Sequence, residues 1–150
     1  MTALRRQEEV SPEAVQALIS TATQSTDETL QDYAAQHLGH LHEQGVLEDN
    51  SEIEATLWAS TKTTEGTVAG VAIEALHKAQ EEGRLINTYP IEDQAWSILN
   101  NDYSDEVKIS ALNVLESADD QELLKIKVEQ LIQNEGNSYS MNLKLNSLIE

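Results

Sequence analysis

The chain has no cysteine and no phenylalanine, and only two of its 150 residues are proline. The absence of cysteine excludes a disulfide framework, a thiolate nucleophile and a cysteine-ligated zinc site. The aromatic fraction of 4% and the apolar fraction of 39% are low for a β-sandwich or a β-barrel. Ala, Leu, Ile and Val must therefore form the core, which favours helices that pack through small and aliphatic side chains. The length predicts a single domain over 1–150.

Basic residues are also scarce. The chain has nine Lys and Arg and 27 Asp and Glu, so its formal net charge is −18. Nucleic acids and anionic membranes select basic surfaces, so neither is expected as a direct partner. The sequence has no run of about 18 apolar residues and no secretory signal, and we expect a soluble, cytoplasmic protein. Between Gln7 and Thr61 there are eleven carboxylates and no Lys or Arg. This one-signed segment predicts an electric field that attracts a basic partner.

The sequence repeats itself at a spacing of 38 residues. Residues 28–58 and 66–96, aligned without gaps, share nine identities in 31 positions, including the pairs Gly45/Gly83 and Trp58/Trp96. Apolar residues recur at helical spacing inside the unit, and the glycines suit left-handed helix ends, so each unit is predicted to be two helices. We expect helix pairs over about 11–45, 51–83, 90–118 and 120–150.

Three features of the second helix of each pair carry a resemblance to a known family. An acidic turn enters the helix at Asp27 and at Asp105, and an alanine and then a leucine follow at fixed positions: Ala34, Ala72 and Ala111, then Leu38, Leu76 and Leu115. In these features the chain resembles the HEAT-repeat family and its bacterial HEAT-like relatives. The resemblance implies an all-α fold, a right-handed α-solenoid of about four antiparallel helix pairs whose second helices line a concave face. Family repeats commonly carry an Arg where this chain has Gln31, Ala69 and Lys108.

A row of polar residues is predicted on the helix faces opposite the buried alanines and leucines, at about 100° of rotation per residue. We call this set the acidic stripe: Asp32, Gln36, Glu43, Glu74, His77, Glu81, Asn113 and Glu116. In a HEAT-like array these rows would lie side by side and form a mainly acidic groove, although an acidic row can also be a solvated face without a partner. The stripe is our candidate binding site for a basic protein.

Other residues that attract attention favour structural roles. His37 falls on the apolar face of its helix and His42 lies about 140° away, so we expect a packed His37, surface positions for His40 and His42, and no metal. Glu74 is the carboxylate with the most apolar neighbours, yet the wheel predicts that it is exposed, so no catalytic carboxylate pair is expected. The two tryptophans are typical of packing between repeats. No cofactor is expected.

We therefore predict a non-catalytic protein-binding module, whose sharpest form is an inhibitor or immunity-type protein that covers the phosphate-binding site of a cationic enzyme. A second hypothesis is a HEAT-like enzyme subunit or lyase-type chaperone, which would hold a small ligand beside Tyr33, His37, Trp58 or Trp96. A third is a scaffold fragment that self-associates through its last helix, where Leu143, Leu145, Leu148 and Ile149 gather. The oligomeric state is left open, with a monomer favoured.

Overall fold

The computed structural model describes residues 11–45, 49–134 and 136–149, and these are folded into α-helices and connecting loops. The helices in chain order are α2 (Pro12–Gln24), α3 (Glu28–Gln44), α4 (Ser51–Ser60), α5 (Val68–Glu81), α6 (Ile91–Asn100), α7 (Asp105–Leu115), α8 (Gln121–Ile132) and α9 (Tyr139–Leu148). The predicted all-α class is confirmed for this part of the chain. No helix in the described ranges combines the length and apolarity that a bilayer crossing requires.

Capping side chains determine where several helices begin. Ser11 accepts a hydrogen bond from the Ala14 backbone N–H, with Pro12 at the first position of α2. The Asp27 carboxylate accepts from the backbone N–H groups of Thr29 and Leu30 and so begins α3. These bonds satisfy donors that a helix cannot satisfy by itself. The predicted starts at Ser11 and Asp27 are confirmed.

Glycines end two of the helices. Gly45 follows α3 with φ 63°, and Gly83 follows α5 with φ 70°. This left-handed conformation is easily adopted only by glycine. After Gly83 the Arg84 backbone N–H donates to the Ala79 carbonyl at 2.9 Å, which closes the last turn of α5. The two glycines that match in the sequence repeat therefore have the same structural role.

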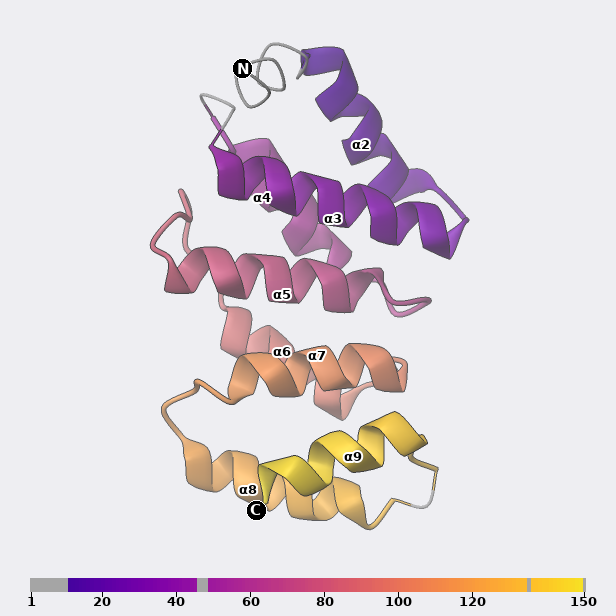
Figure 1. The fold of residues 1–150 in the computed structure, drawn as a ribbon, viewed down its shortest axis with the longest axis vertical. Coiled ribbons are helices and arrows are strands. Elements are labelled where there is room, and N and C mark those ends of the chain that lie inside the picture. Colours follow the sequence, from indigo (N-terminus) through magenta and orange to yellow (C-terminus); the bar gives the residue numbers. More distant parts are fainter. Residues whose placement is uncertain (1–10, 46–48, 135, 150) are drawn as a thin grey trace.

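Four helices lie side by side along the long axis of the molecule: α3, α5, α7 and α9 (Figure 1). Helices α4 and α6 lie behind this row, α2 packs on α3 and α4 at one end, and α8 packs on α9 at the other. The three alanines predicted at the closely packed positions, Ala34, Ala72 and Ala111, are buried. Small residues also allow close approach: a Cβ added to Gly39 would lie 3.3 Å from the Ala75 Cβ, and one added to Gly70 would lie 2.7 Å from the Ser110 Oγ.

Leu30 corrects the predicted buried face of α3, because 49% of its surface is exposed. On the helical wheel Leu30 lies on the same face of α3 as Ala34 and Leu38, both of which are buried. However, α3 belongs to the end of the row, and among the described residues its outer side is covered only in part by α2. A face that is buried in the interior of a stack is thus open at the end.

The predicted roles of His37 and His42 are reversed. His37 is exposed, whereas only 4% of His42 is accessible. The His42 Nε2 lies 2.7 Å from Glu54, and the Arg84 guanidinium donates to the His42 Nδ1 at 2.8 Å. Because arginine can only donate, Nδ1 must be the acceptor, and the proton on Nε2 is donated to the carboxylate.

Glu54 is a buried carboxylate that the sequence did not indicate, since none of its surface is accessible. Besides His42, its oxygens accept from the backbone N–H groups of Ile86 at 2.8 Å and Asn87 at 3.1 Å. Three donors therefore satisfy a carboxylate that would be very costly to bury alone. The chain of contacts from Arg84 through His42 to Glu54 holds the loop after α5 against α3 and α4.

We expect Glu54→Ala to lower the free energy of unfolding by about 3–5 kcal/mol, because it leaves the buried His42 donor and two partly buried backbone N–H groups without an acceptor. Denaturant unfolding followed by circular dichroism measures this change. The matched control is Glu92→Ala, which changes the residue that aligns with Glu54 in the sequence repeat but is exposed near the start of α6. The control should change stability by about 0.5 kcal/mol or less. Equal effects would mean that the buried network contributes no stability.

Candidate functional site

The acidic stripe lies on three neighbouring helices. Helix α3 carries Asp32, Gln36 and Glu43, α5 carries Glu74, His77 and Glu81, and α7 with its C-cap carries Asn113 and Glu116. Helix α5 contacts both α3 and α7, so the three rows are adjacent. All of these side chains are exposed or half-buried, but they differ in what they contact.

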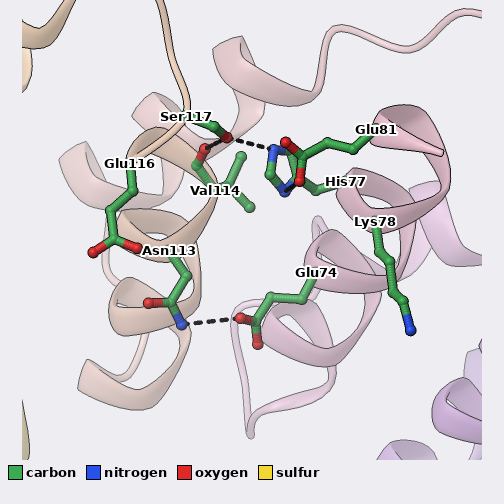
Figure 2. A pocket seen from close by; sticks show the side chains of 8 residues that line it. All are labelled: Glu74, His77, Lys78, Glu81, Asn113, Val114, Glu116 and Ser117. Atoms are coloured by element: carbon green, nitrogen blue, oxygen red, sulfur yellow. Dashed lines mark hydrogen bonds and ion pairs between the residues drawn. The ribbon is translucent and has the colours of Figure 1, made fainter. Parts of the chain in front are cut away.

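Five stripe residues surround one cavity of about 500 Å³ between α5 and α7, which we call the α5–α7 pocket (Figure 2). They are Glu74, His77, Glu81, Asn113 and Glu116, and the remaining lining residues are Lys78, Val114 and Ser117. Figure 2 shows Asn113 and Ser117 of the α7 segment directed toward Glu74 and His77 of α5, whereas the Glu116 side chain extends away from α5. The spacing along each helix predicted the faces, and the contact between α5 and α7 brings those faces together.

Hydrogen bonds position the polar groups across this pocket. The Glu74 carboxylate accepts from the Asn113 Nδ2 at 2.9 Å and from the Ser110 Oγ at 3.0 Å. Both donors are neutral, so Glu74 keeps its charge uncompensated by a cation in these contacts. The carboxylate is therefore fixed in orientation while its negative field is retained.

Two stripe carboxylates are paired with lysines that the wheel analysis did not include. The Lys78 Nζ lies 3.1 Å from Glu43 on α3, so this side chain extends away from α7. The Lys144 Nζ on α9 lies 2.8 Å from Glu116. Lys78 lowers the pKa of Glu43, chiefly by hydrogen bonding and then by its charge. The stripe is consequently less negative than its carboxylates alone would make it.

Asp32 lies in the contact between α3 and the start of α5 rather than in an open groove. One of its carboxylate oxygens accepts a hydrogen bond from the Thr67 hydroxyl at the start of α5, and the side chain is half-buried. The other oxygen, Oδ1, is buried without a hydrogen-bond partner among the described residues. This position makes Asp32 a poor contact for a partner, whereas Gln36 on the same helix is exposed.

Three residues of the pocket, a serine, a histidine and a glutamate, are arranged in the same order as the catalytic triad of a hydrolase. The His77 Nε2 lies 3.0 Å from the Ser117 Oγ, and its Nδ1 lies 3.6 Å from Glu81. The second distance is too long for the hydrogen bond that would orient the imidazole. The backbone N–H groups of Ser117 and Ala118 are already bonded to helix carbonyls, and the Glu74 and Glu116 carboxylates nearby would oppose an oxyanion. These contacts lack the oriented imidazole and the unoccupied N–H donors that the mechanism of such a triad requires.

A second cavity, of about 870 Å³, lies between α2 and α3, and we call it the α2–α3 groove. Apolar side chains such as Leu18, Leu30 and Leu41 dominate its wall, with Tyr33 and His37 among the rest. The rings of Tyr33 and His37 have centroids 5.2 Å apart. This groove is where the hypothesis of a small ligand beside Tyr33 and His37 would place its site.

The tryptophans pack against the hydrophobic core and are partly buried. Trp58 also lies 5.4 Å from Tyr89 between ring centroids, with the Lys62 ammonium 4.8 Å from its ring centroid. Both features are those of packing residues. Within the described ranges, no group of three or more His, Asp or Glu side chains could hold a metal ion.

The buried contact between His42 and Glu54 was missed by sequence reasoning, although a signal was present. Glu54 stands directly after Ile53 and three residues before Leu57, both of which are buried. A carboxylate at such a place in an apolar helix face indicates a partner from elsewhere in the fold. The partner could not be identified because it lies on another helix.

The chain was compared with protein-family models, with curated proteins and with solved structures, and none of them matches it.

The pairing of Glu43 with Lys78 makes a testable prediction about ionisation. Lys78→Met should raise the pKa of Glu43 toward its ordinary value of 4.5, because the variant lacks both the donor and the charge that lower it. The pKa can be read from the side-chain carboxyl carbon in an NMR titration. Lys62→Met, which changes an exposed lysine beside Trp58, should leave the titration of Glu43 unchanged.

Proposed function

We propose that this chain is a HEAT-like α-solenoid that acts as a non-catalytic binding module and captures a basic protein on its acidic stripe. The solenoid arrangement is supported by hydrogen bonds that join neighbouring segments at separations near the 38-residue spacing of the sequence repeat. Lys78 on α5 and Glu43 on α3 are 35 residues apart, and three further bonds join the α7 segment to the α5 segment. Ser110 and Glu74 are 36 residues apart, Ser104 and Gly66 are 38 apart, and Ser117 and His77 are 40 apart. Such regularity is expected where each repeat packs only on its neighbours.

The observation that carries the function is the α5–α7 pocket, where three carboxylates from two helices surround one cavity. Carboxylates in fixed positions are good acceptors for the guanidinium and ammonium groups of Arg and Lys. Glu74, held by two neutral donors, is the best placed acceptor. A partner's basic side chain in this cavity would receive both charge compensation and directed hydrogen bonds.

The charge of the rest of the chain acts on the rate of capture. A net charge of −18 attracts a basic protein over several ångströms before contact, and this speeds association at low salt. A basic enzyme with a phosphate-binding site would be blocked if the stripe covered that site. The sharpest form of the proposal is therefore an inhibitor or immunity-type protein.

The internal lysines add selectivity to this scheme. Lys78 and Glu116 line the pocket, and each is already paired with a residue outside it, Lys78 with Glu43 and Glu116 with Lys144. A partner must replace these contacts with better ones, so diffuse positive charge is a weak competitor. A partner with basic side chains at matching positions is favoured over an arbitrary cationic protein.

Changing the stripe carboxylates to glutamine tests the site. The variant carries Glu43→Gln, Glu74→Gln, Glu81→Gln and Glu116→Gln, and the control carries Glu13→Gln, Glu92→Gln, Glu122→Gln and Glu129→Gln. All four control residues are exposed and lie on α2, α6 and α8, and both variants change the net charge by the same amount. A partner is first captured from lysate of the source cell at low salt and identified by mass spectrometry, and its dissociation constant is then measured by calorimetry.

We expect the stripe variant to bind at least about tenfold more weakly than the control, with binding of the unchanged chain falling steeply as salt rises. Thermal unfolding of both variants checks that they remain folded. Equal loss in the two variants would show that only net charge matters, and the acidic stripe would then be rejected as the site. Capture of many unrelated basic proteins with no defined salt step would also reject the stripe as a specific site.

A further inference from the structure

Large apolar side chains that are exposed gather at the two ends of the molecule. The described residues leave eight of them exposed, and seven belong to α3, to α8 or to α9 with its C-cap. The exception is Ile86, in the loop after α5. Helix α3 lies near one end of the long axis and helices α8 and α9 lie at the other (Figure 1). The long sides of the molecule are therefore mainly polar, and the ends are apolar.

The end formed by α2 and α3 is concave. Leu30 and Tyr33 are exposed to 49% and 57%, and both line the α2–α3 groove of about 870 Å³. Leu30 would be buried if another helix lay against α3, as α7 lies against α5 in the interior. The groove therefore has the size and apolar wall of a helix-binding surface.

The end formed by α8 and α9 carries the complementary projections. Leu123 and Ile126 lie three residues apart on α8 and are exposed. On α9, Tyr139 and Leu143 lie four residues apart, on the side of the helix opposite the buried Met141 and Leu145. An apolar face at the end of a stacked helical array normally requires a polar cap or a neighbour.

We propose that the chain self-associates head to tail, with the α8–α9 end of one copy docked in the α2–α3 groove of the next. In this arrangement α9 of one copy lies beside α3 of its neighbour, which continues the row of α3, α5, α7 and α9. Leu143 and Tyr139 would then cover Leu30 and Tyr33. The apolar contact does not involve the acidic stripe, because none of the stripe residues lines the α2–α3 groove.

Charge determines which ends can pair. Helices α2 and α3, with the α3 cap, carry five carboxylates and no Lys or Arg, so two α2–α3 ends would repel each other: Glu13, Asp27, Glu28, Asp32 and Glu43. Helices α8 and α9 together carry three lysines, Lys125, Lys127 and Lys144, against two glutamates, Glu122 and Glu129. Asp119 and Asp120, which precede α8, make this end slightly acidic, but it is much less acidic than the α2–α3 end. The acidic end therefore selects the α8–α9 end of another copy over its own kind.

A head-to-tail contact of this type is heterologous, and unless the rotation between copies closes a ring, it produces an open chain of copies. Sedimentation velocity over about 10 μM to about 1 mM, the range in which a weak interface dissociates, should show a mass that rises continuously with concentration. A single species with the monomer mass at every concentration would overturn the proposal. The groove would then belong to another occupant, such as a small ligand or residues of this chain outside the described ranges.

Two blocked variants test the polarity of the contact. The first carries Leu30→Gln and Tyr33→Gln, and the second carries Leu123→Gln, Ile126→Gln and Leu143→Gln. Each should associate at least about tenfold more weakly than the unchanged chain, since each lacks one of the two apolar surfaces. Mixed in equal amounts they should form a 1:1 dimer and nothing larger, because only one matching pair of ends remains.

Ile86→Gln is the matched control, since Ile86 is 53% exposed but lies at neither end, and it should associate like the unchanged chain. A dimer formed by either blocked variant alone would show that like ends pair and would overturn the head-to-tail contact. A mixture that remains monomeric would do the same. The stripe variant with four glutamines should still associate, so failure of this inference and failure of the proposed function give different results.

Discussion

The close approach of α3, α5 and α7 is the constraint on which the other features depend. Gly39 and Gly70 lie where a Cβ would reach a neighbouring helix, and the alanines at 34, 72 and 111 are fully enclosed. Because α5 and α7 lie close together, short side chains such as Ser110 and Asn113 on α7 reach Glu74 on α5. Bulky residues at these glycines would separate the helices, and the α5–α7 pocket would lose its second wall.

The parts of the fold that could be predicted from the sequence are those controlled by local chemistry. Ser11 and Asp27 begin helices, and Gly45 and Gly83 end them, because capping and positive φ depend on one residue and its immediate neighbours. The face of a helix is also local, so the spacing of the stripe residues along α5 and α7 predicted one side of each helix. Their convergence on one cavity depended on the assumed packing of the helices.

The predictions that were wrong all concern which other elements cover the face of a helix. Leu30 lies on the apolar face of α3 and is nevertheless exposed, because α3 is near the end of the row. His42 was assigned to the surface and is buried, because Glu54 and Arg84 reach it from other elements. The wheel describes one helix in isolation and contains no information about its neighbours. The lysines that neutralise part of the stripe were missed for the same reason, since Lys144 reaches Glu116 from α9.

The contacts of Glu54 have a consequence for the cooperativity of the chain. In a linear array of helices, one end can unravel while the other stays folded, provided that the links between neighbours are weak. Here a buried carboxylate on α4 accepts hydrogen bonds from the backbone of a loop more than thirty residues later. Separation of the loop would take two of its three donors away from this buried carboxylate, which makes partly unravelled states in this region rare. The first half of the chain and the loop that leads into the second half should therefore unfold as one unit.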